Sequence, residues 1–322
     1  MSTTEILSNY KNEVKTIETE SRIKESKESF LSGLCGNLNV IVPLSVTQKD
    51  RNCHCFIIAD KEKALVYYSN LCNFLKKEKV YFFPYSFIAP YDDELINNAN
   101  VVMRTEVIQA LLEKTKEKIY IVTYPEGVFE KFPEERIQKE KRTIVNKKDK
   151  IQIGDFVEGL NNNGFNKVDF VVEPGEFAVR GNIIDVFSFS YKKPVRIELD
   201  GNDVERLRLF DPNTQLTEDD IKEAKIISNK SLEDKGGNYV SLFNFFNEDW
   251  VIWGDEIGLS ANIIDEKNKQ AIELYEEIKN KSKVVLSLPP KKRFLDKKLF
   301  LEELNRFKRV EFGRENKKNN ST

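Results

Sequence analysis

A glycine-rich stretch near the start of the chain, Gly-Leu-Cys-Gly-Asn-Leu-Asn-Val, has the composition of a phosphate-binding loop. A P-loop has the pattern G-x-x-x-x-G-K-[ST], in which backbone amides hold the phosphates, the lysine neutralises them and the hydroxyl binds Mg²⁺. Gly33 and Gly36 keep the glycine spacing in part, but Asn39 stands where the lysine belongs. Leu38 and Val40 replace the second glycine and the hydroxyl residue. The sequence therefore predicts a degenerate P-loop that does not bind nucleotide.

A second stretch, Trp250 to Glu256 (WVIWGDE), is an apolar run that ends in Asp255 and Glu256, as a Walker B strand does. This signal is weak alone, because strands commonly end in acidic loops, and the P-loop lysine that would complete the site is missing. We therefore expect no nucleotide hydrolysis by these residues.

The chain has four cysteines and a single histidine. With His54 the sole candidate base and no paired nucleophile near it, catalysis of the Ser-His-Asp or Cys-His type is disfavoured. Cys53, His54 and Cys55 could suggest a metal site, but they lie inside the apolar run CHCFIIAD, which is typical of a buried strand. Core packing is the favoured interpretation of the three residues, and neither a metal nor a cofactor is expected.

Composition indicates a multidomain globular chain. Its 322 residues exceed one ordinary core, and 40% hydrophobic with 32% charged residues can form both cores and a charged surface. The net charge of -2 argues against a general polyanion binder. No apolar run reaches the ~18 residues that a membrane span needs. Few cysteines and the lack of a signal peptide lead us to expect a cytoplasmic protein.

The order of apolar patterns predicts a split architecture. Strand-like and helix-like segments alternate from Asn52 to about Gly127, as in a parallel α/β sheet, and α/β character returns after Lys230. Between them, short strands and turns predict an antiparallel sheet with one helix in IGDFVEGLNNNG. The fold class expected is α/β, with a split, degenerate P-loop-like (helicase-type) domain that holds an inserted antiparallel α+β domain. The predicted parts are 1–141 and 230–313 for the α/β domain, 142–229 for the insertion and 314–322 for a polar tail.

Two arginines of the predicted insertion have strand positions that suggest a binding surface. In EFAVR, Arg180 alternates with Phe177 and Val179, and in VRIELD, Arg196 alternates with Val195 and Ile197. Successive side chains of a strand point to opposite faces, so both arginines should point away from the apolar face. Guanidinium groups on such a face can pair with carboxylates of a partner or can simply keep the sheet soluble.

The stretch from Lys167 to Thr217 strongly resembles a domain shared by two families of bacterial repair proteins, UvrB of the excision nuclease and the transcription-repair coupling factor Mfd. The resemblance is carried by EPGEFAVRG, the IIDVF strand, PVRIEL and LFDPxTQ. Flanking segments, VYFFPYSFIAPYDDE with VVMRTEVIQALL and residues 230–313, resemble the α/β portion of Mfd. The short connection PYSFIAPYDDE stands where UvrB would have a long tyrosine-rich hairpin, which makes Mfd the closer match.

The resemblance implies an adaptor that recruits UvrA in transcription-coupled nucleotide excision repair and has no catalysis of its own. Mfd-type proteins are much longer, and their RNA polymerase-binding and ATP-dependent DNA translocase domains would follow this region, so the chain resembles their N-terminal portion. RNA polymerase and DNA would be partners only through such missing C-terminal domains, and no membrane partner is implied.

The residues that match the family's UvrA interface are Arg180, Arg196 and Asp200. Asp200 stands where the family commonly has an aromatic residue. The docking hypothesis requires both guanidinium groups to be exposed and not bound by their own neighbours. Arg206 and Arg208 are interpreted as a solvated face, and Gly175 and Gly181 as providers of turn and bulge geometry.

Two alternatives stay open from the sequence. One is a UvrB-like, ATP-dependent damage-verification subunit of the excision nuclease. The other is a nucleic-acid-binding module that uses the basic run Arg136 to Lys150, which we interpret rather as a solvated linker because acids are interspersed with its lysines.

Overall fold

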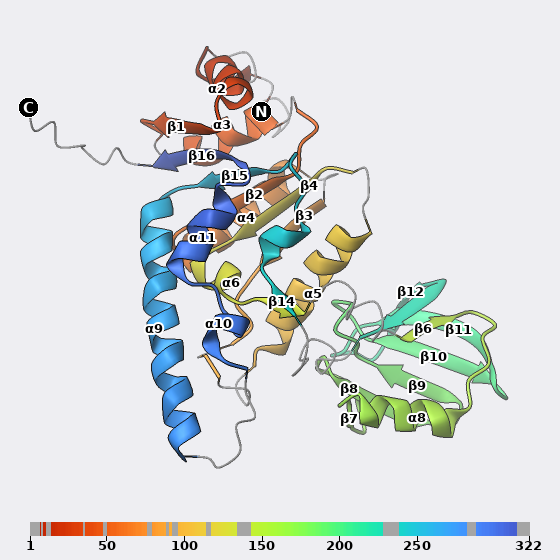
Figure 1. Ribbon diagram of the computed structural model, residues 1–322. Helices are drawn as coiled ribbons and strands as arrows, with labels where there is room; N and C mark the ends of the chain where they lie inside the picture. Colours follow the sequence, from red (N-terminus) through yellow and green to blue (C-terminus); the bar gives the residue numbers. More distant parts are fainter. Residues whose placement is uncertain are drawn as a thin grey trace, which may run out of the picture.

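The computed structural model describes these residues: 7, 9–10, 14–34, 36–47, 50–75, 79–87, 90–91, 96–113, 117–133, 143–227, 238–281 and 288–313. They form two six-stranded sheets with their helices, and two small two-stranded sheets (Figure 1). The predicted α/β part with a parallel sheet and the predicted antiparallel sheet are both confirmed.

The larger sheet has six strands in the order β1-β16-β15-β2-β4-β3, and every neighbouring pair is parallel. Its strands are β1 (Glu28–Ser32), β2 (His54–Ile57), β3 (Lys79–Phe83), β4 (Ile119–Thr123), β15 (Val251–Gly254) and β16 (Lys308–Gly313). The two last strands in the chain, β15 and β16, thus lie between β1 and β2. The larger sheet is therefore built from segments that precede and follow the smaller sheet in the sequence.

The helices of this part are α2 (Val14–Glu25), α3 (Leu38–Thr47), α4 (Lys61–Phe74), α5 (Asn98–Leu112), α6 (Pro125–Phe129), α9 (Ile257–Lys281), α10 (Pro290–Arg293) and α11 (Lys297–Leu304), with the 3-10 helix η2 (Leu242–Phe245). α4 packs against β3 and β4, and α5 packs against β3. Asp60 and Asn97 accept hydrogen bonds from the first turns of α4 and α5, which explains where both helices begin. Two short strands, β5 (Phe132–Pro133) and β14 (Tyr239–Val240), pair with each other.

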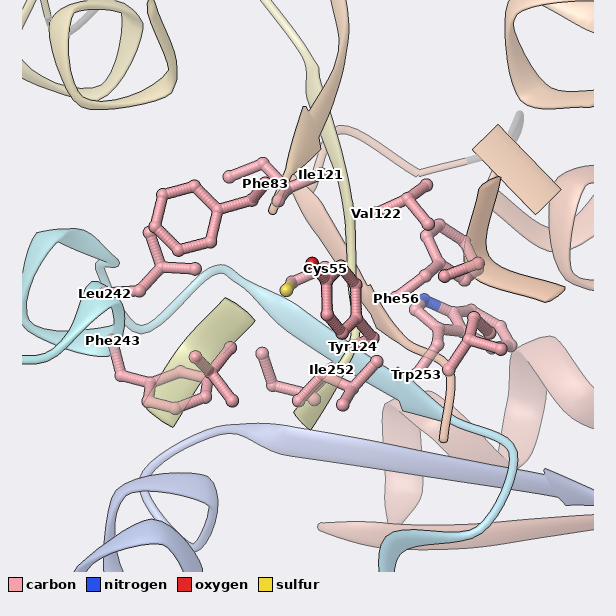
Figure 2. Close-up of a cluster of buried hydrophobic side chains, with 14 of the residues drawn as sticks. Cys55, Phe56, Phe83, Ile121, Val122, Tyr124, Leu242, Phe243, Ile252 and Trp253 are labelled. Atoms are coloured by element: carbon pink, nitrogen blue, oxygen red, sulfur yellow. The ribbon is translucent and has the colours of Figure 1, made fainter. Parts of the chain in front are cut away.

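The core of this part is apolar on both faces of the sheet. All four residues of β2 and of β15 are buried, as are all five of β4, which is the pattern of a parallel sheet covered on both sides. The rings of Phe56 and Trp253 are stacked with centroids 5.7 Å apart. Figure 2 shows these rings beside side chains from neighbouring strands, with Leu242 and Phe243 from η2 in the same cluster.

The smaller sheet has the order β12-β11-β10-β9-β8-β7. Its strands are β7 (Asn166–Lys167), β8 (Glu176–Arg180), β9 (Ile183–Val186), β10 (Val195–Asp200), β11 (Asp203–Phe210) and β12 (Thr217–Asp220). The pairs are antiparallel except β7 with β8, which is parallel. The predicted helix is confirmed as α8 (Ile153–Asn162), and its Leu160 joins the core of the domain's apolar face. β6 (Thr143–Asn146) pairs with β13 (Glu223–Ile226).

The smaller domain contacts the larger one through α5. Phe189 packs with Val101 and Val102 of that helix. Two ion pairs flank this contact, Lys192 with Glu106 at 3.2 Å and Lys225 with Glu113 at 3.1 Å. Figure 1 shows α5 as the helix of the larger part that reaches toward the small sheet.

Several sequence predictions fall outside the described residues or need correction. The predicted strand KVVLSL lies almost wholly among residues left undescribed, as do the polar tail and part of the basic run Arg136 to Lys150. The helix expected around Lys267 to Lys279 is longer and runs from Ile257 to Lys281, because its first turns bury Ser260, Ala261 and Ile264. Among the described helices, none has the length and apolar character needed to cross a bilayer.

Candidate functional site

Arg180 and Arg196 of the small sheet bind the same carboxylate, that of Asp185. Arg196 donates from Nε to Oδ1 at 2.8 Å and from Nη2 to Oδ2 at 2.9 Å, a bidentate pair. Arg180 donates to Oδ2 through its Nη2 atom. We call these three side chains the Arg–Asp–Arg clamp.

Strand register explains why the three side chains meet. Arg196 of β10 lies directly opposite Asp185 of β9, and Arg180 ends β8 beside the turn that leads into β9. The Asp185 side chain is fully buried, and a buried carboxylate is stable only when it is paired. Its hydrogen bonds and charge raise the pKa of Arg196.

The expectation that both guanidinium groups stand uncommitted in solvent is wrong. The Arg180 side chain is 39% exposed but that of Arg196 is only 15% exposed, and Asp185 holds both. Strand alternation does put both arginines on the face opposite Phe177 and Val195. That face, however, is itself partly covered by other side chains. The sequence signal that we missed is the lone acid in the apolar run IIDVF, since a charge inside a buried strand needs a partner.

The cover is a small apolar cluster of Val171, Ala178, Phe187 and Phe210. The Arg196 guanidinium lies 4.5 Å from the centroid of the Phe210 ring. Its Nη1 atom also donates to the carbonyl of Gln215 at 3.3 Å. Arg196 is therefore mostly a packed, positioning side chain, and Arg180 is the more accessible cation of the two.

The remaining candidates on this face differ from one another. Asp200 is exposed at the end of β10, next to the turn at Gly201. Arg206 is exposed, as expected, and its nearest ion-pair contact is Glu205 at 3.9 Å. Arg208, by contrast, binds the carboxylate of Glu198 and is not a freely solvated charge.

Gly175 and Gly181 serve backbone geometry, as predicted. Their φ angles are +92° and +60°, values that side-chain-bearing residues rarely adopt. A Cβ atom on Gly175 would also lie 3.2 Å from the Phe189 ring, whereas one on Gly181 would meet open space.

The two glycines of the glycine-rich stretch lie between β1, an edge strand of the sheet, and α3. Gly33 and Gly36 have φ angles of +75° and +57°. Asn39 falls in the first turn of α3, where its carbonyl accepts a hydrogen bond from the Tyr67 hydroxyl at 3.1 Å. Asp255, at the end of the predicted Walker B run, accepts the Ala59 backbone N–H at 2.8 Å, and burial raises its pKa. The Asp255 carboxylate thus joins two strand ends of the parallel sheet.

The Cys-His-Cys stretch belongs to the core. His54 and Cys55 are fully buried in β2, which confirms the buried strand for these two residues, and burial raises the pKa of the Cys55 thiol. Cys53 precedes β2 and is only partly buried, packed against the core. His54 Nε2 contacts Asp50 Oδ1 at 3.1 Å, and Lys118 donates to the same oxygen at 3.2 Å. Within the described residues, no group of three or more potential ligands could hold a metal ion.

Comparison with known proteins shows a family match for the small domain. The family model of the UvrB interaction domain matches residues 144–232, which include the whole Arg–Asp–Arg clamp. Curated relatives named transcription-repair-coupling factor are similar to larger parts of the chain. The relative from Rickettsia prowazekii is 29% identical over 161 residues, which are 50% of this chain and 14% of that protein. The one from Bacillus subtilis is 24% identical over 194 residues, or 59% of this chain and 16% of that protein.

A third relative, from Myxococcus xanthus, is 44% identical over 64 residues, which are 20% of this chain and 5% of that protein. The chain thus spans less than a fifth of the length of each of these three relatives. Together, these matches identify the small domain as a UvrB interaction domain, in a chain homologous to part of the bacterial transcription-repair-coupling factors.

Proposed function

We propose that the chain recruits UvrA in transcription-coupled nucleotide excision repair, and that the docking surface is the arginine-bearing face of the small domain. The observation that carries the proposal is the match of this domain to the UvrB interaction domain. The clamp removes the free exposure that the docking hypothesis required of Arg196, so the partly exposed Arg180 is the main cation of the proposed surface. Arg180, Arg196 and Asp200 are the proposed UvrA-binding residues.

The clamp supports docking through pre-organisation. Two guanidinium groups around one carboxylate leave a net charge of +1 on this group of side chains. Arg180 is exposed enough to meet an acidic group of a partner, while Asp185 and Arg196 hold its orientation. Binding groups that are already fixed lose less conformational entropy on association. We therefore propose that Arg196 contributes to docking mainly by holding Asp185 and packing on Phe210, and that it makes little direct contact with the partner.

The proposal divides the chain into residues 1–141 and 230–313 for a split, degenerate P-loop-like α/β domain, with 142–229 as the inserted UvrA-binding domain. We propose that the α/β domain is non-catalytic, since Asn39 stands where a P-loop has its lysine. Contacts with RNA polymerase and DNA, and ATP-dependent translocation, would then belong to further domains of full-length family proteins. Action in the cytoplasm is part of the same proposal.

The test is a calorimetric titration of UvrA from the same organism with the wild-type chain and with Arg180→Ala and Arg196→Ala. We expect measurable binding by the wild type and a loss of roughly 2 kcal/mol or more in each variant, the size of an interface hot spot. Glu62→Ala, an exposed change on α4, is the control and should bind as the wild type does. Unchanged binding in both arginine variants would remove this surface from the proposal, and no binding by the wild type would remove UvrA as the partner.

The UvrB-like alternative is tested by ATP turnover. Steady hydrolysis of ATP by the purified chain, abolished by a change at Asn39 or Asp255, would favour the alternative over an adaptor. We expect no turnover above a buffer blank.

A further inference from the structure

Three large apolar side chains of the small domain, here called the apolar patch, are exposed on two segments that contact the clamp. Phe170, Val172 and Leu216 are 61%, 49% and 68% exposed, although each is a large apolar side chain. Scattered exposed apolar residues are ordinary, but an exposed aromatic ring next to an arginine has the composition that protein interfaces favour.

Hydrogen bonds tie the patch to the clamp. Arg180 lies with its guanidinium carbon 5.3 Å from the centroid of the Phe170 ring, and its Nη1 atom donates to the carbonyl of Asp169 at 3.4 Å. Gln215, the residue before Leu216, donates from Nε2 to the carbonyl of Val171 at 3.1 Å. The carbonyl of the same Gln215 accepts from Arg196. Phe170 and Leu216 are thus presented by two segments that the clamp and Gln215 hold together.

Contacts of the neighbouring residues also hold the backbone around Phe170 in place. Val171 is fully buried in the apolar cluster on this face of the sheet. The Glu176 carboxylate accepts the backbone N–H groups of Val172 and Glu173, both at 2.8 Å. Phe170 is therefore an exposed aromatic ring on a rigid backbone, which can be buried by a partner at little entropic cost.

We propose that Phe170 is the main apolar anchor of the UvrA docking surface, with Leu216 as a second apolar contact. The partner surface is an apolar pocket on UvrA whose rim carries carboxylates that meet Arg180. The inference rests on the proposed function and assigns the binding energy to residues outside the set Arg180, Arg196 and Asp200. The positive charge of the clamp favours an acidic rim, and the exposed Phe170 ring beside Arg180 favours an apolar pocket.

The test is the dissociation constant of the full chain for UvrA, measured for Phe170→Ala, Leu216→Ala, Arg180→Ala and the double variant Phe170→Ala/Arg180→Ala. The matched control is Val66→Ala on α4, since Val66 is 62% exposed in the larger domain. We expect Phe170→Ala to raise the dissociation constant at least tenfold, Leu216→Ala about threefold and Val66→Ala less than twofold. If ring and guanidinium act as a unit, the double variant is weaker than wild type by less than the product of its single effects.

The outcomes separate this inference from the proposed function. If Arg180→Ala weakens binding and Phe170→Ala leaves it within twofold of the wild type, the docking surface stands and the anchor assignment is overturned. If the wild-type chain does not bind UvrA, both fail. Sedimentation of the wild type and Phe170→Ala gives a further check, since a dimer that Phe170→Ala dissociates would assign the patch to self-association and overturn the inference. Equal thermal midpoints in all variants establish that folding is unchanged.

Discussion

The indole N–H of Trp253 donates a hydrogen bond to Nδ1 of His54, at 3.2 Å, in the buried centre of the parallel sheet. Because an indole nitrogen can only donate, Nδ1 of His54 must be the unprotonated ring nitrogen, and Nε2 carries the proton toward Asp50. The sole histidine of the chain is therefore neutral in the folded protein, with both ring nitrogens engaged.

This geometry predicts a loss of stability in mild acid. Burial lowers the pKa of His54 from 6.5, so the unfolded chain takes up a proton at a higher pH than the folded one. The free energy of unfolding should then fall as the pH drops below about 6.5, by at most about 1.4 kcal/mol per pH unit for one proton. The lowered pKa of Asp50 acts in the same direction at more acid pH. Urea unfolding followed by tryptophan fluorescence from pH 7.5 to 5.5 measures the slope.

His54→Gln is the control for that experiment. It removes the titrating group, so the variant should be less stable than wild type at pH 7.5 but almost independent of pH between 7.5 and 5.5. A slope equal to that of the wild type would assign the acid sensitivity to other residues.

Breaking the Arg–Asp–Arg clamp should destabilise the small domain. Asp185→Ala leaves Arg196 without its bidentate partner in a mostly buried position, and removal of one member of a buried ion pair costs about 3 kcal/mol. Arg206→Ala, on the same sheet but exposed, should change the free energy of unfolding by less than about 0.5 kcal/mol. Urea unfolding measures both variants. If Asp185→Ala is as stable as Arg206→Ala, the clamp adds nothing to the stability of the fold.

A second buried cation predicts a stringent requirement for arginine. Arg104 of α5 is 3% exposed and donates to the carbonyls of Pro84 and Gly127 at 2.6 and 2.8 Å. Its guanidinium lies 4.3 and 4.5 Å from the ring centroids of Phe83 and Phe132. Arg104→Lys keeps the charge but loses the planar donor fork, so we expect a loss of about 2 to 4 kcal/mol in unfolding free energy. An Arg104→Lys variant as stable as the wild type in urea unfolding would contradict this expectation.

Three glycine-to-alanine changes should differ in sign. Gly175→Ala combines a positive φ with a contact to Phe189 and should cost most, more than about 2 kcal/mol. Gly181→Ala has the strained φ without the contact and should cost about 1 to 2 kcal/mol. Gly258→Ala lies within α9 with open space around it and should stabilise by about 0.5 to 1 kcal/mol. Thermal unfolding of the three variants gives the order, and a destabilised Gly258→Ala would contradict it.

Local sequence pattern predicted most strands of both sheets, but not the edge strand β1, which lies in a stretch where no strand was expected. The apolar runs around Phe56 and Ile121 predict buried parallel strands because they alternate with helix-like segments along the chain. Residue parity places Arg180 and Arg196 on one face without knowledge of the fold.

The clamp itself could not be predicted from pattern. It depends on the register between β9 and β10, which brings Asp185 opposite Arg196, and register is a long-range property set by packing. The cover over that face also comes from another segment, which buries Val171 against Phe210. For the same reason, the first turns of α9 were missed, because their helical packing depends on contacts of Ala261 and Ile264 with the distant sheet.

The strand order of the larger sheet has a consequence for synthesis on the ribosome. β15 and β16 fill the space between β1 and β2, so the sheet cannot close until Gly313 has been made. The small domain is complete in sequence well before that point and can fold first, as domains commonly do during translation. Until β15 and β16 arrive, the nascent α/β part exposes the unpaired edge of β2, and this interval is when the chain is most exposed to aggregation.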